Sequence, residues 1–175
     1  MSDLRMHLDR EKSLQLTSFT DGVHVYLPDV ADEFANRNGN AKLLTTLAKF
    51  EAGLIEFGTF SFDLQRARDL GCLEDCPRVE TEIASSGASD FTLFSRRFED
   101  PRLALDLLTV FEHARIRLLL AKAYPGLIRS GLPLYQSAMR KKLSSHAQCS
   151  FLDVCYGYLA IDLPVSSIAT CDPDK

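Results

Sequence analysis

The clearest pattern of hydrophobic and polar positions lies between residues 40 and 57. Large apolar side chains recur there at intervals of four, three, four and three residues, at Leu43, Leu47, Phe50, Leu54 and Phe57. This spacing predicts an amphipathic helix with these side chains in the core and with Glu51 and Glu56 outside the apolar face. Asn40 is a suitable N-cap and Gly58 a suitable stop. Gly53 costs roughly 1 kcal/mol relative to Ala inside a helix, which indicates that another element packs closely there.

A second helical pattern begins at Asp100-Pro101, where an N-cap residue is followed by Pro at the first helical position. The helix is expected to end before Pro125-Gly126. Its predicted core-facing stripe consists of Ala104, Leu107, Leu108, Phe111, Ala114 and Leu118. A third helix is predicted over residues 133–146. Its apolar positions form either a core-facing stripe or an exposed patch for a partner, and they are Leu134, Tyr135, Ala138, Met139 and Leu143.

The remaining segments predict less regular structure. Residues 23–27 have strand propensity after the Asp21-Gly22 turn, and short helices are expected over 2–13 and 30–34. Residues 59–99 are expected to be a long loop with short helical pieces, and a loop of that length is often functional. The predicted fold class is mostly α: a helical domain with a minor β element.

Composition and charge exclude several functional classes. The chain has 175 residues with 46% hydrophobic and 25% charged residues, which is typical of a globular domain. Its net charge of -4 argues against a broad nucleic-acid surface, so we expect no nucleic-acid partner. We also expect no membrane association, because no apolar run approaches the roughly 20 residues that span a bilayer. The charged N-terminal residues do not resemble a signal peptide, and a cytoplasmic location is expected.

The cysteines do not predict a metal site. Their number is odd and their spacing irregular, at Cys72, Cys76, Cys149, Cys155 and Cys171. A structural zinc site requires tighter pairs or nearby histidines, whereas the four histidines are scattered. We interpret the cysteines as reduced, partly buried thiols. Phosphate-binding glycine loops and the common hydrolase and metalloprotease motifs are also missing from the sequence, so no cofactor is expected.

Three stretches resemble the NorD and CbbO family, the partners of MoxR-type AAA+ ATPases. Ala52-Gly53 and Ile55-Glu56-Phe57-Gly58-Thr59-Phe60 stand as in the family's H-Q-A-G-H-I-E-F-G-T-F run. Asp21-Gly22 with Tyr26-Leu27-Pro28 resembles its strand ending in Y-L-P. Residues 111–116, Phe-Glu-His-Ala-Arg-Ile, and then Tyr124-Pro125-Gly126 resemble its L-E-D-A-R-I and Y-P-G elements. The resemblance covers residues 20–130 in patches and implies the region that precedes a von Willebrand A (VWA) domain, with a degenerate metallopeptidase-like helical core.

The departures from the family pattern indicate that this chain is not an enzyme. Phe50 and Leu54 stand where the family has two histidines, and neither side chain can bind a metal. Glu51 matches the position where a peptidase keeps its general base, and Glu112 matches the distant acid. We expect no catalytic residue and no metal ligand, and we expect Glu112 to pair with Arg115 three residues later on one helix. Residues 90–95 do not supply the D-x-S-x-S motif of a VWA metal site, because Phe94 occupies the place of the second serine.

The resemblance implies a single N-terminal adaptor domain over residues 1–175, with 1–19 and 166–175 frayed and the VWA domain outside this chain. It implies binding to a MoxR-type AAA+ ATPase hexamer of the CbbQ type, and action on Rubisco or another client through the separate VWA domain. The alternatives are a NorD-type module that activates nitric oxide reductase and a degenerate metallopeptidase-like ligand-binding domain.

Basic residues are the candidate partner contacts. They are Arg96, Arg97, Arg140, Lys141 and Lys142. They are interpreted either as a solvated surface or as a contact for an acidic partner, since charges at the edge of an interface steer association.

Overall fold

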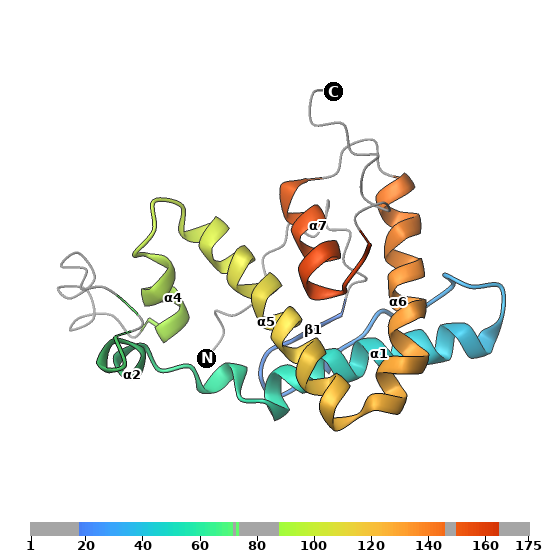
Figure 1. Ribbon diagram of the computed structural model, residues 1–175, viewed down its shortest axis with the longest axis horizontal. Helices are drawn as coiled ribbons and strands as arrows, with labels where there is room; N and C mark the ends of the chain where they lie inside the picture. The colour runs from blue at the N-terminus through green and yellow to red at the C-terminus, as the bar shows by residue number, and fades with distance from the viewer. Residues whose placement is uncertain (1–17, 72, 74–87, 146–149, 165–175) are drawn as a thin grey trace.

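The computed structural model describes residues 18–71, 73, 88–145 and 150–164, and these residues are mostly helical. Three long helices cross one another: α1 (Arg37–Glu56), α5 (Pro101–Ala123) and α6 (Pro125–Ser145) (Figure 1). Shorter elements complete the fold: β1 (Phe19–Thr20), β2 (Val25–Tyr26), η1 (Thr59–Ser61), α2 (Leu64–Asp69), α4 (Asp90–Ser95), α7 (Phe151–Cys155) and η2 (Tyr156–Ala160). The prediction of a mostly α fold with a minor β element is confirmed.

Helix α1 begins four residues earlier than the sequence predicted. Its N-cap is Asn36, whose side chain accepts a hydrogen bond from the Gly39 backbone N–H over 2.6 Å. The predicted cap, Asn40, lies inside the helix, and its side-chain amide forms two hydrogen bonds with the backbone of Phe34. The end was predicted correctly, because Gly58 follows the helix in the left-handed conformation with φ of 74°.

Helix α5 begins and ends where predicted, but it buries a different face. Asp100 caps its N-terminus by accepting hydrogen bonds from two backbone N–H groups. Phe111 and Leu118, which the sequence placed in the core, are 57% and 61% exposed. The buried positions are Val110, His113, Ile116 and Leu120. The helix has apolar residues on nearly every side, so periodicity alone does not select the face that neighbouring helices cover.

Helix α6 is longer than predicted because it begins at Pro125 rather than at Pro133. Pro125 fits the first turn, where no backbone N–H is needed, and Pro133 is accommodated inside the helix. Of the predicted stripe, Leu134 is half-buried and the others are buried, namely Tyr135, Ala138, Met139 and Leu143. The core-facing interpretation of this stripe is therefore confirmed, and these side chains are not available to a partner.

The three long helices approach closely at two glycines of the core. A Cβ atom on Gly53 of α1 would lie 2.7 Å from Cγ2 of Ile116 on α5. A Cβ atom on Gly131 of α6 would overlap Oγ1 of Thr46 on α1. The expected close packing at Gly53 is confirmed, and Gly131 plays the same part between α1 and α6.

The shorter segments differ from prediction in several places. The predicted strand over 23–27 is reduced to β2, which pairs antiparallel with β1 so that Phe19 faces Tyr26. The helix predicted over 30–34 is wrong, since that segment has no helical turn. Two residues at the end of the segment predicted to be frayed are ordered parts of the fold. Ser18 is buried, and Phe19 belongs to β1. The helix expected over 2–13, most of the loop over 72–87 and the C-terminal segment 166–175 lie outside the described residues. Among the described helices, none is long and apolar enough to cross a bilayer.

Candidate functional site

The helix that carries the first family-like motif turns its two metal-ligand positions into the apolar core. Phe50 is 2% exposed and Leu54 is 5% exposed, which confirms their predicted burial. The ring of Phe50 stands edge-on to the ring of Tyr135 on α6, with 5.7 Å between centroids. Both positions are therefore filled by side chains that pack, and neither offers a donor atom to a metal.

Glu51, predicted to lie outside the buried face, is 2% exposed, and that prediction was wrong. Its Oε1 accepts a hydrogen bond from the Ser18 hydroxyl over 2.9 Å. Its Oε2 has no hydrogen-bond partner among the described residues. Burial raises the pKa of Glu51 to about 7, and the Ser18 hydrogen bond opposes that rise. The carboxyl group is therefore close to half protonated at neutral pH.

A second buried titratable group faces the core from α5. His113 is 1% exposed, and neither of its ring nitrogens has a partner among the described residues. Burial lowers its pKa to about 4, although the neighbouring Glu112 charge opposes this. The imidazole is therefore neutral at physiological pH. Its ring stands edge-on to the ring of Tyr156 in η2, 5.5 Å between centroids.

Two tyrosines connect these groups across the core. The hydroxyls of Tyr135 and Tyr156 are 2.9 Å apart and share a hydrogen bond. Burial raises the pKa of Tyr135, and the negative charge of Glu51 adds to that rise. We refer to these five residues as the buried polar cluster: Ser18, Glu51, His113, Tyr135 and Tyr156. None is more than 6% exposed, so a substrate could reach the cluster only if the helices separated.

Glu112, the counterpart of the family's distant acid, belongs to a separate network. It forms the predicted ion pair with Arg115, with 2.6 Å between Oε2 and Nη2. The Thr59 hydroxyl donates to the same Oε2 over 2.6 Å, and Arg115 also donates to Thr59 Oγ1 and to the Phe57 carbonyl. Burial raises the pKa of Glu112, but the hydrogen bonds from Arg115 and Thr59 outweigh it and the pKa is lowered. The Glu112 carboxylate therefore joins α5 to the segment that follows α1.

Residues 56–60 are the meeting point of the motifs that carry the family resemblance. The Tyr124 hydroxyl, from the Y-P-G element, donates to Glu56 Oε1 over 2.6 Å. Arg115, from the element resembling L-E-D-A-R-I, binds Thr59 as described above. Gly22 of the Asp-Gly turn lies against the Phe60 ring, because a Cβ atom there would be 3.2 Å from Cδ1. Segments that are far apart in the sequence are thus held together by direct contacts at one place.

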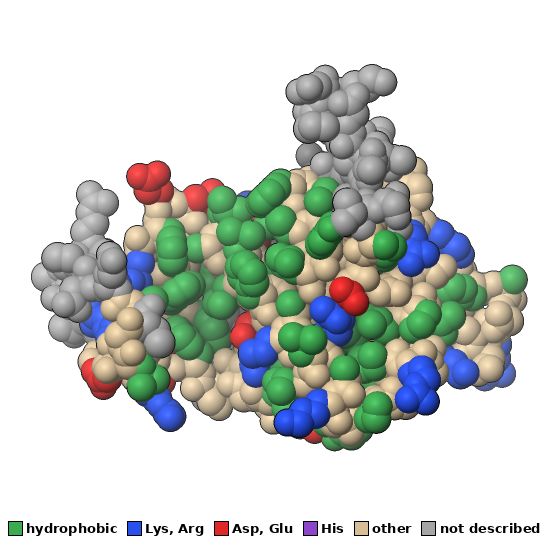
Figure 2. Space-filling model, in the orientation of Figure 1, with side chains coloured by type: hydrophobic (Ala, Val, Ile, Leu, Met, Phe, Trp, Pro, Cys, Tyr) green, Lys and Arg blue, Asp and Glu red, His purple; other side chains and the backbone are tan. Residues whose placement is uncertain are grey.

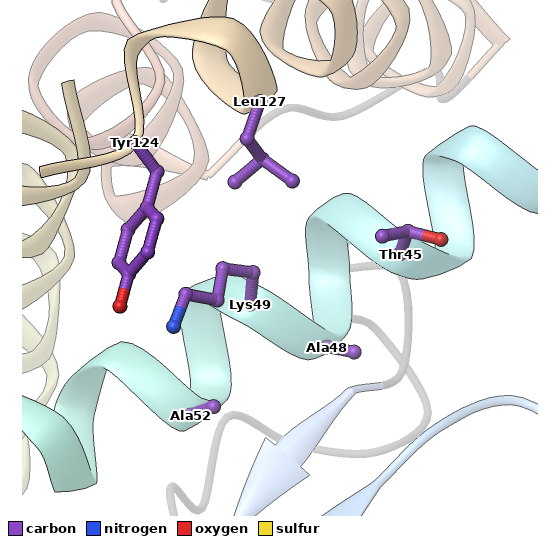
Figure 3. A pocket seen from close by; sticks show the side chains of 6 residues that line it. All are labelled: Thr45, Ala48, Lys49, Ala52, Tyr124 and Leu127. Carbon is purple, nitrogen blue, oxygen red and sulfur yellow. The ribbon is translucent and has the colours of Figure 1, made fainter.

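An open groove lies beside this meeting point, between α1 and the junction of α5 with α6 (Figure 3). Its volume is about 310 Å³. We call it the α1–α6 groove, and its lining residues are Thr45, Ala48, Lys49, Ala52, Tyr124 and Leu127. Lys49 and Tyr124 form one wall, with the Lys49 ammonium 4.0 Å from the centroid of the Tyr124 ring. The same ammonium is paired with Glu56 over 2.5 Å.

The predicted basic contacts do not form a single patch. Arg96 and Arg97 follow α4, whereas Arg140, Lys141 and Lys142 lie on α6, and Figure 1 shows α4 and α6 at opposite sides of the molecule. A partner would therefore contact them as two separate groups. Their role in binding stays a prediction.

Two of the α6 cations already have partners within the chain. Lys141 donates to the Glu33 carbonyl and its ammonium lies 5.0 Å from the centroid of the Phe34 ring. Lys142 lies 3.8 Å from the Glu33 carboxylate, and burial lowers its pKa. These lysines fix the segment before α1 onto α6, so Arg140 is the one of the three whose side chain has no partner among the described residues.

The described residues contain no group of three or more His, Cys, Asp or Glu side chains placed to hold a metal ion. Cys155 is a free thiol. The other four cysteines lie outside the described residues. The chain matches no protein-family model, no curated protein and no solved structure.

Proposed function

We propose that this chain is a non-catalytic adaptor module of a CbbO-type Rubisco activase. The module binds a MoxR-type AAA+ ATPase hexamer of the CbbQ type in the cytoplasm and couples it to a client that a separate VWA domain reaches. The observation that carries the proposal is the meeting of the family-like motifs at residues 56–60. Arg115 donates a hydrogen bond to Thr59, and Tyr124 donates one to Glu56. These contacts give a structural reason for the motifs to occur together in one chain.

The burial of Phe50 and Leu54 supports a non-catalytic role. A zinc peptidase needs two imidazoles at these positions to hold the metal that activates water. Phe50 and Leu54 are instead part of the hydrophobic core. Glu51, at the position of the general base, is 2% exposed and hydrogen-bonded to Ser18. A binding role needs only a folded surface, which this core maintains.

The test is association of the purified chain with a MoxR-type ATPase hexamer of the CbbQ type, in the presence of a non-hydrolysable ATP analogue. We expect the chain to co-elute with the ATPase hexamer in size-exclusion chromatography. An unrelated AAA+ hexamer serves as the control and should not retain the chain. Absence of co-elution by a chain whose circular dichroism shows a folded helical protein would overturn the proposal.

The client is decided by a second measurement. A CbbO-type module, joined to its VWA domain, should increase the ATPase-dependent recovery of Rubisco inhibited by a sugar phosphate. A NorD-type module would bind the same class of ATPase but would act on nitric oxide reductase. Reactivation of Rubisco supports the proposed client, and activity on nitric oxide reductase alone would replace it with the alternative.

A further inference from the structure

Helix α5 carries a row of apolar side chains on its outer face. The row follows intervals of three and four residues in strict alternation, and its members are Ala104, Leu107, Phe111, Ala114, Leu118 and Ala121. None of the six is buried, and Phe111 and Leu118 are 57% and 61% exposed. The buried residues of α5, among them His113 and Ile116, lie on the other side of the helix. We call the six apolar residues the α5 seam.

The α5 seam belongs to a larger apolar surface. Figure 2 shows hydrophobic side chains gathered over α5 between α4 and α7, whose places are labelled in Figure 1. Phe111 and Leu118 are the most exposed large apolar side chains of this helix. A contiguous apolar surface of this kind marks a place where proteins associate, because its contact with water is unfavourable.

The spacing along the seam matches another helix. An apolar row with a mean interval of 3.5 residues is the pattern by which two helices pack in a coiled coil, where each side chain enters a gap between side chains of the facing helix. The seam runs from Ala104 to Ala121. At 1.5 Å per residue this is a contact line of about 27 Å. The occupant is therefore a helix that lies along α5.

The charges beside the seam are already balanced within the chain. On one side Arg115 is paired with Glu112, and on the other side Arg117 lies 3.6 Å from Asp162. A strongly acidic or strongly basic helix would therefore gain little from these residues. The seam fits a facing helix that is apolar along the contact and close to neutral beside it.

The order of large and small side chains along the seam fits a second copy of α5 that runs in the opposite direction. When Phe111 of one copy lies opposite Ala114 of the other, Leu107 lies opposite Leu118 on both sides of the two-fold axis. The largest side chain of the seam then faces one of the smallest. A parallel pair would instead place the two Phe111 rings against each other and leave a gap between the two Ala114 methyl groups.

Charges at the two ends of α5 also favour the antiparallel arrangement. Lys122 is exposed near the end of α5, and Glu99 is exposed just before its start. In an antiparallel pair, Lys122 of one copy approaches Glu99 of the other, and this contact occurs twice because of the symmetry. The helix dipoles of the two copies are then also opposed, which is favourable.

We propose that this protein forms a symmetric dimer through the α5 seam, in which the two α5 helices pack antiparallel. The inference goes beyond the proposed function and does not depend on it. Because the contact is a single helix pair, the interface lies at the small end of the range for specific association, and monomer and dimer should exchange at micromolar concentrations.

Sedimentation velocity of the purified chain tests the dimer over concentrations from about 1 to 500 µM. The seam variant carries Phe111→Glu and Leu118→Glu. The matched control carries Val30→Glu and Leu70→Glu, which are 73% and 69% exposed and lie outside α5. Circular dichroism melting confirms that each variant is folded.

We expect the wild type to change from monomer to dimer over this range. The seam variant should dimerise at least about tenfold more weakly, because two carboxylates per copy would lose water in an apolar contact. The control should change the dissociation constant by less than about threefold, since exposed positions outside the interface contribute little.

A second pair of variants tests the direction of the helices. One carries Leu107→Glu with Leu118→Lys, and the other carries Leu107→Glu with Leu118→Glu. In the antiparallel dimer the first pair of changes places opposite charges face to face, whereas the second places like charges there. The first variant should therefore dimerise at least about tenfold more tightly than the second. Leu107 is half-buried, and both variants carry the same change there, so any effect of that change on folding is common to them.

Three results would overturn the proposal. The first is a wild-type chain that stays monomeric up to about 500 µM, including one whose seam variant loses affinity for the ATPase hexamer, because the seam would then be covered by a different protein. The second is a dimer that the seam variant leaves unchanged. The third is an equal dissociation constant for the two direction variants, which would exclude the antiparallel pair.

Discussion

Ser18 and Glu51, 33 residues apart, share a hydrogen bond of 2.9 Å in the interior of the protein. The hydroxyl of Ser18 satisfies Oε1, whereas Oε2 is buried without a partner among the described residues. A buried carboxylate with one such bond is poorly solvated, so the protonated form is favoured. The resulting pKa of about 7 makes the stability of this core depend on pH.

Replacing Glu51 by Gln should stabilise the protein at alkaline pH. The folded pKa of Glu51 lies near 7 and the unfolded pKa near 4.5, so its contribution to stability is complete below 4.5 and is lost as pH rises to 7. Gln cannot ionise and keeps its contribution. We expect the free energy of unfolding of Glu51→Gln to exceed that of the wild type by about 2–3 kcal/mol at pH 8. At pH 4.5 the two free energies should differ little. Urea denaturation at the two pH values measures this difference.

Glu56→Gln is the matched control on the same helix. Hydrogen bonds from Lys49 and Tyr124 lower the pKa of Glu56, so its ionised form is the favoured one. This substitution should not increase stability at pH 8. If Glu51→Gln and the wild type have the same pH dependence, Glu51 is not buried as described.

His113 should have the opposite pH dependence. Its folded pKa is about 4 and its unfolded pKa about 6.5, so its contribution is complete above 6.5 and is lost as pH falls to 4. His113→Leu removes this loss. The free energy of unfolding of the variant, relative to that of the wild type, should therefore be about 1–2 kcal/mol higher at pH 5 than at pH 7.5. The histidine ring resonances in NMR provide a direct check, since those of His113 should not titrate between pH 5 and 8.

The two opposite dependences should cancel in the wild type between about pH 4.5 and 6.5. In that interval folding of the wild type takes up a proton at Glu51 and releases one at His113. Glu51→Gln alone should therefore give a stability that rises with pH, and His113→Leu alone one that falls. The double variant should again be nearly independent of pH. Parallel slopes for the two single variants would show that the groups do not titrate as stated.

Local signals in the sequence were sufficient to predict much of the helical framework. Asp100 with Pro101, and Gly58, have conformational requirements that do not depend on the rest of the fold, and both mark helix ends. The core stripe of α1 was predicted because its other face is polar. In α5 both faces are apolar, so the buried side depends on how α1, α6 and η2 pack against it, and the prediction selected the exposed side at Phe111.

The buried polar cluster depends on tertiary contacts that the sequence does not encode locally. Tyr135 forms a hydrogen bond with Tyr156, which lies 21 residues later in the sequence. Glu51 accepts a hydrogen bond from Ser18, which lies 33 residues earlier. One signal was available for His113, which has helical spacing with the buried Val110 and Ile116. The two hydrogen-bonded pairings join residues that are far apart in the sequence, and they follow from how the elements pack, which periodicity cannot specify.

Truncation of the two buried motif positions should be costly. Phe50→Ala should destabilise the protein by about 3–5 kcal/mol and Leu54→Ala by about 2–5 kcal/mol, because each leaves a cavity in the core. Ile55→Ala on the same helix is the control. Because Ile55 is 38% exposed, this substitution should reduce the free energy of unfolding by less. Chemical denaturation measures the three values. An unchanged melting midpoint for Phe50→Ala would contradict the packing described for α1.

The purified protein should contain no stoichiometric zinc. Phe50 and Leu54 supply no ligand atoms, and Glu112 is engaged by Arg115 and Thr59. Elemental analysis of the protein after dialysis measures this directly. Stoichiometric zinc that is lost on changing Glu51 or Glu112 to Gln would contradict the prediction. Introducing His at both positions 50 and 54 should destabilise the core rather than restore a site, because buried imidazoles need partners.

The contact between Thr59 and Arg115 should couple the end of α1 to α5. Thr59→Val removes a hydroxyl that donates to Glu112 and accepts from Arg115, so it should cost about 1–2 kcal/mol. Arg115→Met removes the other side of the network. Because the two residues share partners, the double variant should lose less than the sum of the single losses, by about 0.5–2 kcal/mol in a double-mutant cycle. Thr45→Val, at an exposed site on α1, is the control and should show additive losses with Arg115→Met. Additive losses for Thr59→Val as well would mean that the network does not join these segments, and the structural reason given for the shared motifs would fail with it.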